Sequence, residues 1–89
     1  MNNDIICGKP LNPRVLSVSP MEDYKLFLTF TNGERRVFDA KPLLSSRVFK
    51  PLNEKSFFES VKAAYGSITW PRDIDYCPDT LYIESVQVN

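Results

Sequence analysis

The hydrophobic pattern of residues 24–39 predicts a β-hairpin. Aromatic and branched side chains alternate through residues 24–30, and a second extended run follows at residues 34–39. Asn32-Gly33 lies between the two runs and is a preferred pair for a two-residue turn, because both turn positions need a positive φ. The residues expected to share the inner face of the first strand are Tyr24, Leu26, Leu28 and Phe30.

A two-residue turn also fixes which residues of the hairpin face each other. It pairs Leu28 with Val37 and places both on the inner face of the sheet. Phe27 and Phe38 then point to the opposite face. A second apolar face needs cover, either from the N-terminal residues or from another chain.

Two further strand regions follow from the same kind of pattern. Residues 14–18 form an extended run bracketed by Pro13 and Pro20, which suit strand ends because proline lacks an amide donor. Residues 63–70 alternate around Gly66 and predict a second, shorter hairpin.

Three short helices are expected between and after these strands. Asp39 can cap a helix over residues 40–45, and Asn53 can cap one over residues 54–61. Proline is tolerated in the first turn of a helix, so residues 78–85, which begin with Pro78, predict the third.

These elements predict an α+β domain. Its small antiparallel sheet has about five strands, arranged as two hairpins, and packs with two or three short helices over residues 13–89. Residues 1–12 are expected to form a flexible or extended lead-in. Residues 86–88 fit either a continuation of the last helix or an edge strand.

Composition excludes several classes of function. The 89 residues carry 11 basic and 11 acidic side chains, and a general nucleic-acid binder normally has a basic excess. The chain contains no histidine, the usual general base and metal ligand. The charge is nevertheless polarised, at +3 over residues 1–62 and −3 over residues 63–89, and a polarised surface can steer a charged partner.

The chain is expected to be cytoplasmic. It has neither an N-terminal secretory pattern nor an apolar run of the roughly 20 residues that a membrane span requires. Cys7 and Cys77 are far apart in sequence, without the spacing of a zinc or redox motif. One disulfide between them is an alternative, but a reducing cytoplasm favours two separate thiols.

The acidic residues of the C-terminal segment partly match the pattern of a calcium-binding loop. Asp73, Asp75, Asp79 and Glu84 match positions 1, 3, 7 and 12 of a calcium-loop template. Position 6, which requires glycine for a sharp turn, is Pro78. We therefore expect Asp73 and Asp75 to make the loop polar and Asp79 to lie favourably at a helix N-terminus. No metal or other cofactor is expected.

Carboxylate chemistry is a further alternative. Asp39, Asp73 and Asp75 are candidate acids and bases, but no motif brings a pair of them across a cleft. A small ligand-binding or sensor domain, or a carboxylate enzyme with a pocket beside Trp70, is kept as the rival to a non-enzymatic function.

Two separated motifs resemble a known family. Residues 30–39 read F-T-N-G-E-R-R-V-F-D, similar to an F-x-N-G-E-x-R-x-F-D hairpin. Residues 70–82 read W-P-R-D-I-D-Y-C-P-D-T-L-Y, similar to a W-P-x-x-x-D-x-x-P-D-x-L-Y ending. Both occur in this order in a family of short bacterial proteins of unknown function, and the resemblance extends over about residues 13–84.

The resemblance implies a small α+β domain with no established activity or cofactor. Such proteins are often encoded beside another short gene, in an arrangement like a toxin–antitoxin pair. Some members carry an additional helix-turn-helix domain after this module. The present sequence does not contain that domain, so direct nucleic-acid binding is not expected.

A protein-interaction module is therefore the leading hypothesis. The expected partner is a small toxin-like protein from an adjacent gene, and a homodimer is a second expectation, with no membrane role. Interfaces favour aromatic side chains and arginine, although core packing explains the same aromatic residues equally well. The residues predicted for the partner surface are Phe27, Arg35, Arg36, Phe38, Trp70, Asp73 and Asp75.

Overall fold

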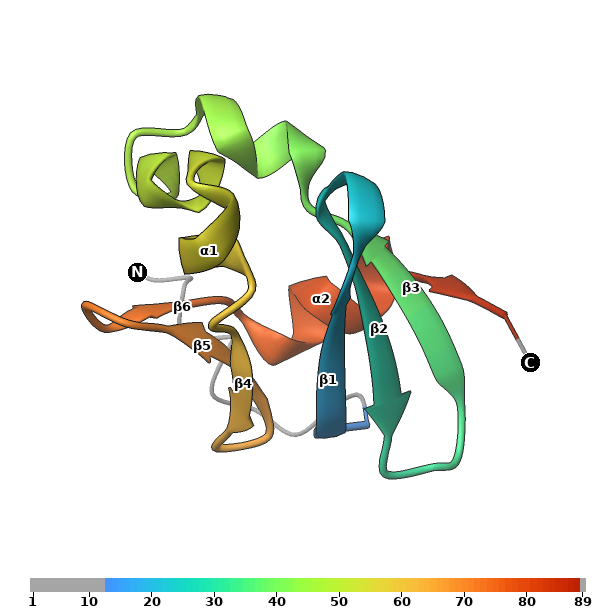
Figure 1. Cartoon of the computed structure of the whole chain (residues 1–89). Helices are drawn as coiled ribbons and strands as arrows, with labels where there is room; N and C mark the ends of the chain where they lie inside the picture. Colours follow the sequence, from blue (N-terminus) through green and yellow to red (C-terminus); the bar gives the residue numbers. More distant parts are fainter. Residues whose placement is uncertain (1–12, 89) are drawn as a thin grey trace.

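Residues 13–88 are described by a computed structural model, in which two antiparallel sheets pack with short helices (Figure 1). The first sheet has the strand order β1-β2-β3-β7, formed by Val15–Met21, Lys25–Phe30, Arg35–Asp39 and Val86–Gln87. The second has the order β4-β5-β6, formed by Lys62–Ala64, Ser67–Trp70 and Ile74–Asp75. The helices are α1 (Lys55–Phe58) and α2 (Pro78–Glu84), with the 3-10 helices η2 (Glu22–Tyr24), η3 (Lys41–Ser45) and η4 (Lys50–Asn53).

The α+β class predicted from the sequence is confirmed. The arrangement of its strands is not the expected one, because seven strands form two sheets where about five were predicted in one. The undecided tail is settled as an edge strand, since β7 pairs antiparallel with β3. The predicted lead-in at residues 1–12 lies outside the described residues.

The first hairpin forms, but its predicted register is wrong by one residue. The amide of Phe30 donates to the carbonyl of Glu34 at 2.9 Å, which leaves a three-residue loop. Gly33 adopts a φ of +89° and donates to the carbonyl of Phe30 at 3.0 Å. This is the geometry of a type I turn closed by a glycine bulge, which Asn-Gly accommodates as readily as the expected two-residue turn.

The shift reverses the two faces of β3. Leu26 pairs with Phe38, and both side chains are buried, whereas Val37 pairs with Phe27 on the opposite face. The prediction that Val37 faces the core and Phe38 faces outward was therefore wrong. A slip of one residue moves every side chain of a strand to the other face.

The second hairpin forms as predicted. Ala64 pairs with Ser67 across a two-residue turn of Tyr65 and Gly66, which have φ values of 54° and 79°. Two consecutive positive φ angles define the mirror-image turn that suits the twist of a two-stranded ribbon.

Two of the three predicted helices are altered. The first segment is the 3-10 helix η3, and its N-cap is Ala40 and not Asp39, although the Asp39 Oδ1 accepts the Lys41 amide at 3.0 Å. The second helix shrinks to the single turn α1. Asn53 does not cap it; its amide group donates to the carbonyls of Leu44 and Lys50 and closes the loop around η4. The third helix, α2, forms as predicted.

The core lies between the two sheets and the short helices. Trp70 is its largest buried side chain, and its indole Nε1 donates to the carbonyl of Phe58 at 3.0 Å. Its ring contacts Phe49 and Phe58, each at a centroid distance of 6.3 Å. Other fully buried members are Leu26, Leu28, Phe30, Leu52, Ile68 and Leu81.

Cys77 is disulfide-bonded, which differs from the favoured expectation of two separate thiols. Cys7 lies outside the described residues.

Candidate protein-interaction face

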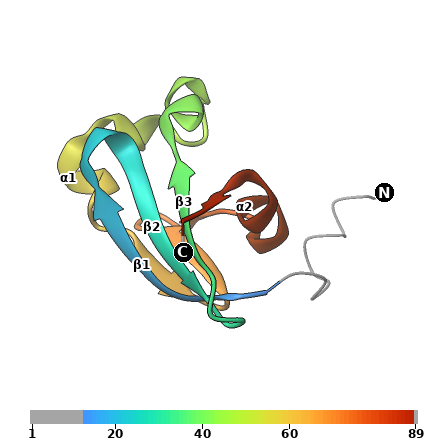
Figure 2. The same cartoon turned by 90° about the vertical axis from the view of Figure 1, so that its right-hand side faces the viewer.

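The four-stranded sheet has one face that does not contact the core. In Figure 2, β1, β2 and β3 cross the front of the molecule. The strand register aligns Phe27, Val37 and Val86 as a row across three strands of this sheet. We call this side of the sheet the outer face, and its principal residues are Met21, Lys25, Phe27, Arg35, Val37, Asp39, Val86 and Val88.

The outer face carries apolar side chains, and the most accessible of them lie on or next to its edge strands β7 and β1. Val86 and Val88 are 66% and 52% exposed, and Met21 is 42% exposed. Phe27 and Val37 are half-buried, since neighbouring side chains flank them. A shallow hollow of about 480 Å³ opens among these residues at the end nearest Glu84. Contiguous exposed apolar side chains on a small domain are typical of an interaction surface.

Charged side chains lie on both sides of the apolar row. Arg35 is at one end of β3, and Asp39 is at the other end beside Lys25, its cross-strand neighbour. The Asp39 carboxylate also lies 3.4 Å from Lys41, whose ammonium group contacts Asp23 at 2.8 Å. The hydrogen bond from Lys41 lowers the pKa of the Asp23 carboxyl. The outer face therefore has an apolar centre and a rim that carries both signs of charge.

Arg36 lies under the outer face and attaches the last strand to the first hairpin. Its Nε donates to the Ser85 hydroxyl at 2.7 Å, and its Nη2 donates to the Ser85 carbonyl at 2.8 Å. Its Nη1 forms an ion pair with Glu34 at 2.8 Å, and the guanidinium lies 4.3 Å from the centroid of the Tyr82 ring. These contacts hold the end of α2, and with it the start of β7, against β3.

Glu34 completes this network and makes it sensitive to acid. Its Oε1 accepts hydrogen bonds from the Tyr82 hydroxyl and from Arg36, each at 2.8 Å. The Tyr82 hydrogen bond, followed by that from Arg36, lowers the pKa of the Glu34 carboxyl. The Glu34 carboxylate stabilises the folded state fully at pH values above its unfolded-state pKa. This stabilisation is lost as the pH falls through the lower pKa that Glu34 has in the folded state.

We therefore expect acid to loosen β7 through Glu34. Between neutral pH and about pH 3, wild type should lose more free energy of unfolding than Glu34→Gln does, because the variant has no carboxylate to protonate. Urea unfolding at a series of pH values measures this difference. Glu59→Gln, at an exposed position outside the network, is the matched control. Equal pH dependence of wild type and Glu34→Gln would contradict the assignment.

The predicted partner surface divides into three groups in the structure. Phe27 and Arg35 lie on the outer face. Arg36 is largely covered, at 14% side-chain exposure, and serves the network below that face. Phe38 and Trp70 are 3% and 1% exposed, so both belong to the core and are not available at the surface.

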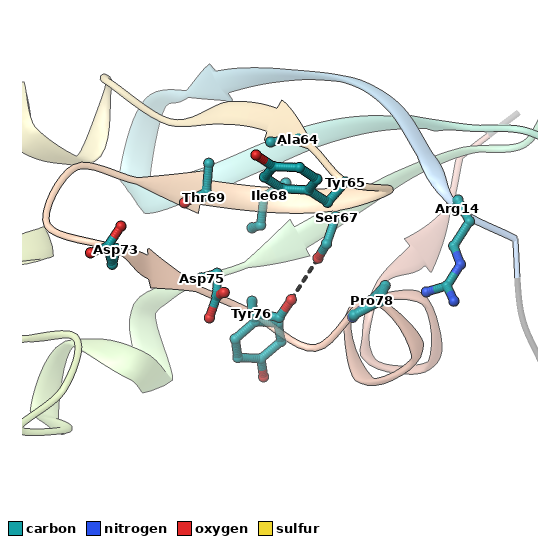
Figure 3. A pocket seen from close by; sticks show the side chains of 10 residues that line it. All are labelled: Arg14, Ala64, Tyr65, Ser67, Ile68, Thr69, Asp73, Asp75, Tyr76 and Pro78. Atoms are coloured by element: carbon teal, nitrogen blue, oxygen red, sulfur yellow. Dashed lines mark hydrogen bonds between the residues drawn. The ribbon is translucent and has the colours of Figure 1, made fainter. Parts of the chain in front are cut away.

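The last two predicted residues, Asp73 and Asp75, are exposed beside β6, away from the outer face. They line one end of a hollow of about 390 Å³ along β5, and Arg14 lies at its other end (Figure 3). The Ser67 hydroxyl within it donates to the carbonyl of Tyr76 at 2.6 Å. Trp70 is not among the residues that line this hollow, and its side chain is buried in the core.

Sequence reasoning missed six of the eight outer-face residues, and for its three valines the reason is identifiable. Val37 was assigned to the core because of the register error, and Val86 and Val88 belonged to the undecided tail. The alternation of Val86-Gln87-Val88 was the available signal, since it matches a strand with one apolar face. Only the pairing of β7 with β3 shows which sheet the valines extend.

A family model described as "Protein of unknown function (DUF2442)" matches residues 15–87. The chain belongs to the DUF2442 family. The DUF2442 match begins with the first residue of β1 and ends with the last residue of β7, so it includes both sheets and the closing strand. The chain has no significant match among curated proteins or among solved structures.

The part of the DUF2442 protein that the structure describes contains neither a metal-binding cluster nor a membrane-spanning helix. Within residues 13–88, the acidic and cysteine side chains do not gather in a group of three or more that could hold a metal ion. No helix in this described range is both long and apolar enough to cross a membrane.

Proposed function

We propose that this DUF2442 protein is a non-enzymatic protein-interaction module that binds its partner on the outer face. The observation that carries the proposal is the row of Phe27, Val37 and the 66% exposed Val86 on the side of the sheet away from the core. The cores of protein interfaces are apolar and their rims are polar. The outer face has this composition, with Arg35 and Asp39 at its two ends.

The proposed partner is a small protein encoded beside this one, with which it would form an antitoxin-like pair in the bacterial cytoplasm. The hairpin and ending motifs support this part of the proposal, because they resemble those of companion proteins encoded in such pairs. The partner chemistry that suits the face is an apolar strip with an acidic group placed to meet Arg35 and a basic group placed to meet Asp39.

Co-expression with the product of the neighbouring gene tests the proposal. Wild type should co-elute with that product in a fixed ratio when only one of the two carries a tag. Val86→Asp should weaken the affinity by about 30-fold or more, because it places a charge in the apolar row of the interface. Val48→Asp is the matched control, since Val48 is 65% exposed and Val86 is 66% exposed, but Val48 lies between η3 and η4.

Circular dichroism should show that both variants remain folded. If Val86→Asp binds the partner as well as Val48→Asp does, the outer face is not the docking surface. If wild type never co-elutes with the neighbouring product and that product is harmless when expressed alone, the antitoxin-like pairing is wrong.

A further inference from the structure

We infer that a second copy of this chain covers the outer face, in a symmetric dimer whose two-fold axis runs along the row of Phe27, Val37 and Val86. The inference rests on the proposed function, because it treats the outer face as a docking surface. It goes further by naming an occupant and the orientation in which it binds.

The strand register sets which residues meet in such a dimer. Arg35, Val37 and Asp39 are successive outward-facing residues of β3, so Arg35 and Asp39 lie at equal distances on either side of Val37. A two-fold axis across the strands through Val37 reverses the strand direction of the second copy. Arg35 of each copy is then opposite Asp39 of the other.

The charges of the face suit this arrangement. Lys25 and Arg35 supply two positive charges, and Asp39 and Glu84 supply two negative charges, so the face is neutral as a whole. An isologous interface joins a surface to itself and must therefore be self-complementary. The proposed axis makes it so, because it creates two Arg35–Asp39 pairs between the copies and superimposes the apolar rows.

The size of the face indicates a weak dimer. Four strands spaced about 4.8 Å apart and about five residues long present a footprint on the order of 300 Å². Stable interfaces bury roughly 800 Å² on each partner, so this face by itself is well below that size and supports a weak, transient association. Two sheets packed in this way are within about 30° of alignment, as in common sandwiches. A weak dimer would allow another protein to displace the second copy from the same face.

Sedimentation equilibrium over about 5 to 500 μM tests the dimer. Wild type should pass from monomer toward dimer over this range. Arg35→Glu should raise the dissociation constant at least about tenfold, because it places the introduced carboxylate of one copy against Asp39 of the other. Asp39→Arg should do the same by opposing two arginines. Arg47→Glu, at an exposed loop position, is the matched control and should dimerise as wild type does.

Mixing the two charge variants gives the decisive result. An Arg35→Glu copy and an Asp39→Arg copy restore both opposite-charge pairs, so their mixture should form a heterodimer at concentrations where each variant alone is monomeric. A concentration-independent monomer for wild type, or a mixture that stays monomeric while both variants are folded, overturns the inference. If Asp39→Arg does not fold, because it loses the hydrogen bond from the Lys41 amide, Val86→Asp replaces it and must abolish dimerisation.

The failure of this inference is distinguishable from failure of the proposed function. A monomeric wild type that binds the neighbouring gene product through Val86 refutes the dimer and supports the proposed function. A dimer broken by Val86→Asp, with no binding to that product, supports the dimer and refutes the partner.

Discussion

Replacing Trp70 with alanine is expected to remove about 3–5 kcal/mol from the free energy of unfolding. The indole is 1% exposed and packs between Phe49 and Phe58, so its removal leaves a cavity that these rings cannot fill. A chain of 89 residues has a total stability of roughly 4–13 kcal/mol. The variant should therefore lose a large share of this stability, measured as a lower midpoint of urea denaturation.

Two further variants separate packing from surface effects. Trp70→Phe keeps an aromatic ring but removes the 3.0 Å indole donor to the Phe58 carbonyl, which still accepts the Val61 amide at 3.3 Å. The expected cost is about 0.5–1.5 kcal/mol for the lost hydrogen bond in addition to the lost volume. Tyr65→Ala, at a fully exposed turn position, should change stability little. If Trp70→Ala remained as stable as wild type but lost partner binding, Trp70 would act at the surface and not in the core.

Replacing Arg36 with methionine is expected to remove about 2–3 kcal/mol of stability and to detach β7. Arg36 is 14% exposed and donates to Glu34 and to both oxygens of Ser85, so methionine fills its space but satisfies none of these acceptors. Removing one partner of a covered charged pair is costly because the other loses its compensation.

Hydrogen exchange measures the detachment of β7 directly. The Val88 amide donates to the Arg35 carbonyl at 2.8 Å, and its exchange should accelerate in Arg36→Met beyond the increase expected from the global loss of stability. Arg47→Met is the matched control and should leave this amide protected. Unchanged protection of Val88 in Arg36→Met would show that strand pairing alone holds β7. Since Val86 and Val88 belong to the outer face, detachment should also weaken partner binding.

The positions of the turns and of the last helix followed from local chemistry. Tyr65-Gly66 and Asn32-Gly33 place a glycine where the backbone needs a positive φ, and Pro78 begins α2 where a missing amide has no cost. These preferences act within a few residues and do not depend on what the rest of the chain does. They determined the α+β class and the places where the chain reverses.

The candidate site could be predicted only in part. Phe27 was assigned to the outward face for a valid reason, because the alternation of the first strand fixes its side. Arg35 was selected because interfaces favour arginine, although the predicted register placed it on the same face as Val37. Phe38 and Trp70 were not separable from interface residues, since a buried aromatic and an exposed one have the same local pattern. The missing information was their position relative to strands distant in sequence.

Sequence alone determined that this chain contains a hairpin at Asn32-Gly33, a second at Gly66 and a helix from Pro78. Only the tertiary structure decided the register of the first hairpin, because Asn-Gly fits both a two-residue and a three-residue loop. The three-residue loop buries Phe38 beside Leu26 and turns the smaller Val37 outward. Burial of the larger apolar side chain is the stronger driving force, and the same choice creates the face on which β7 completes the row.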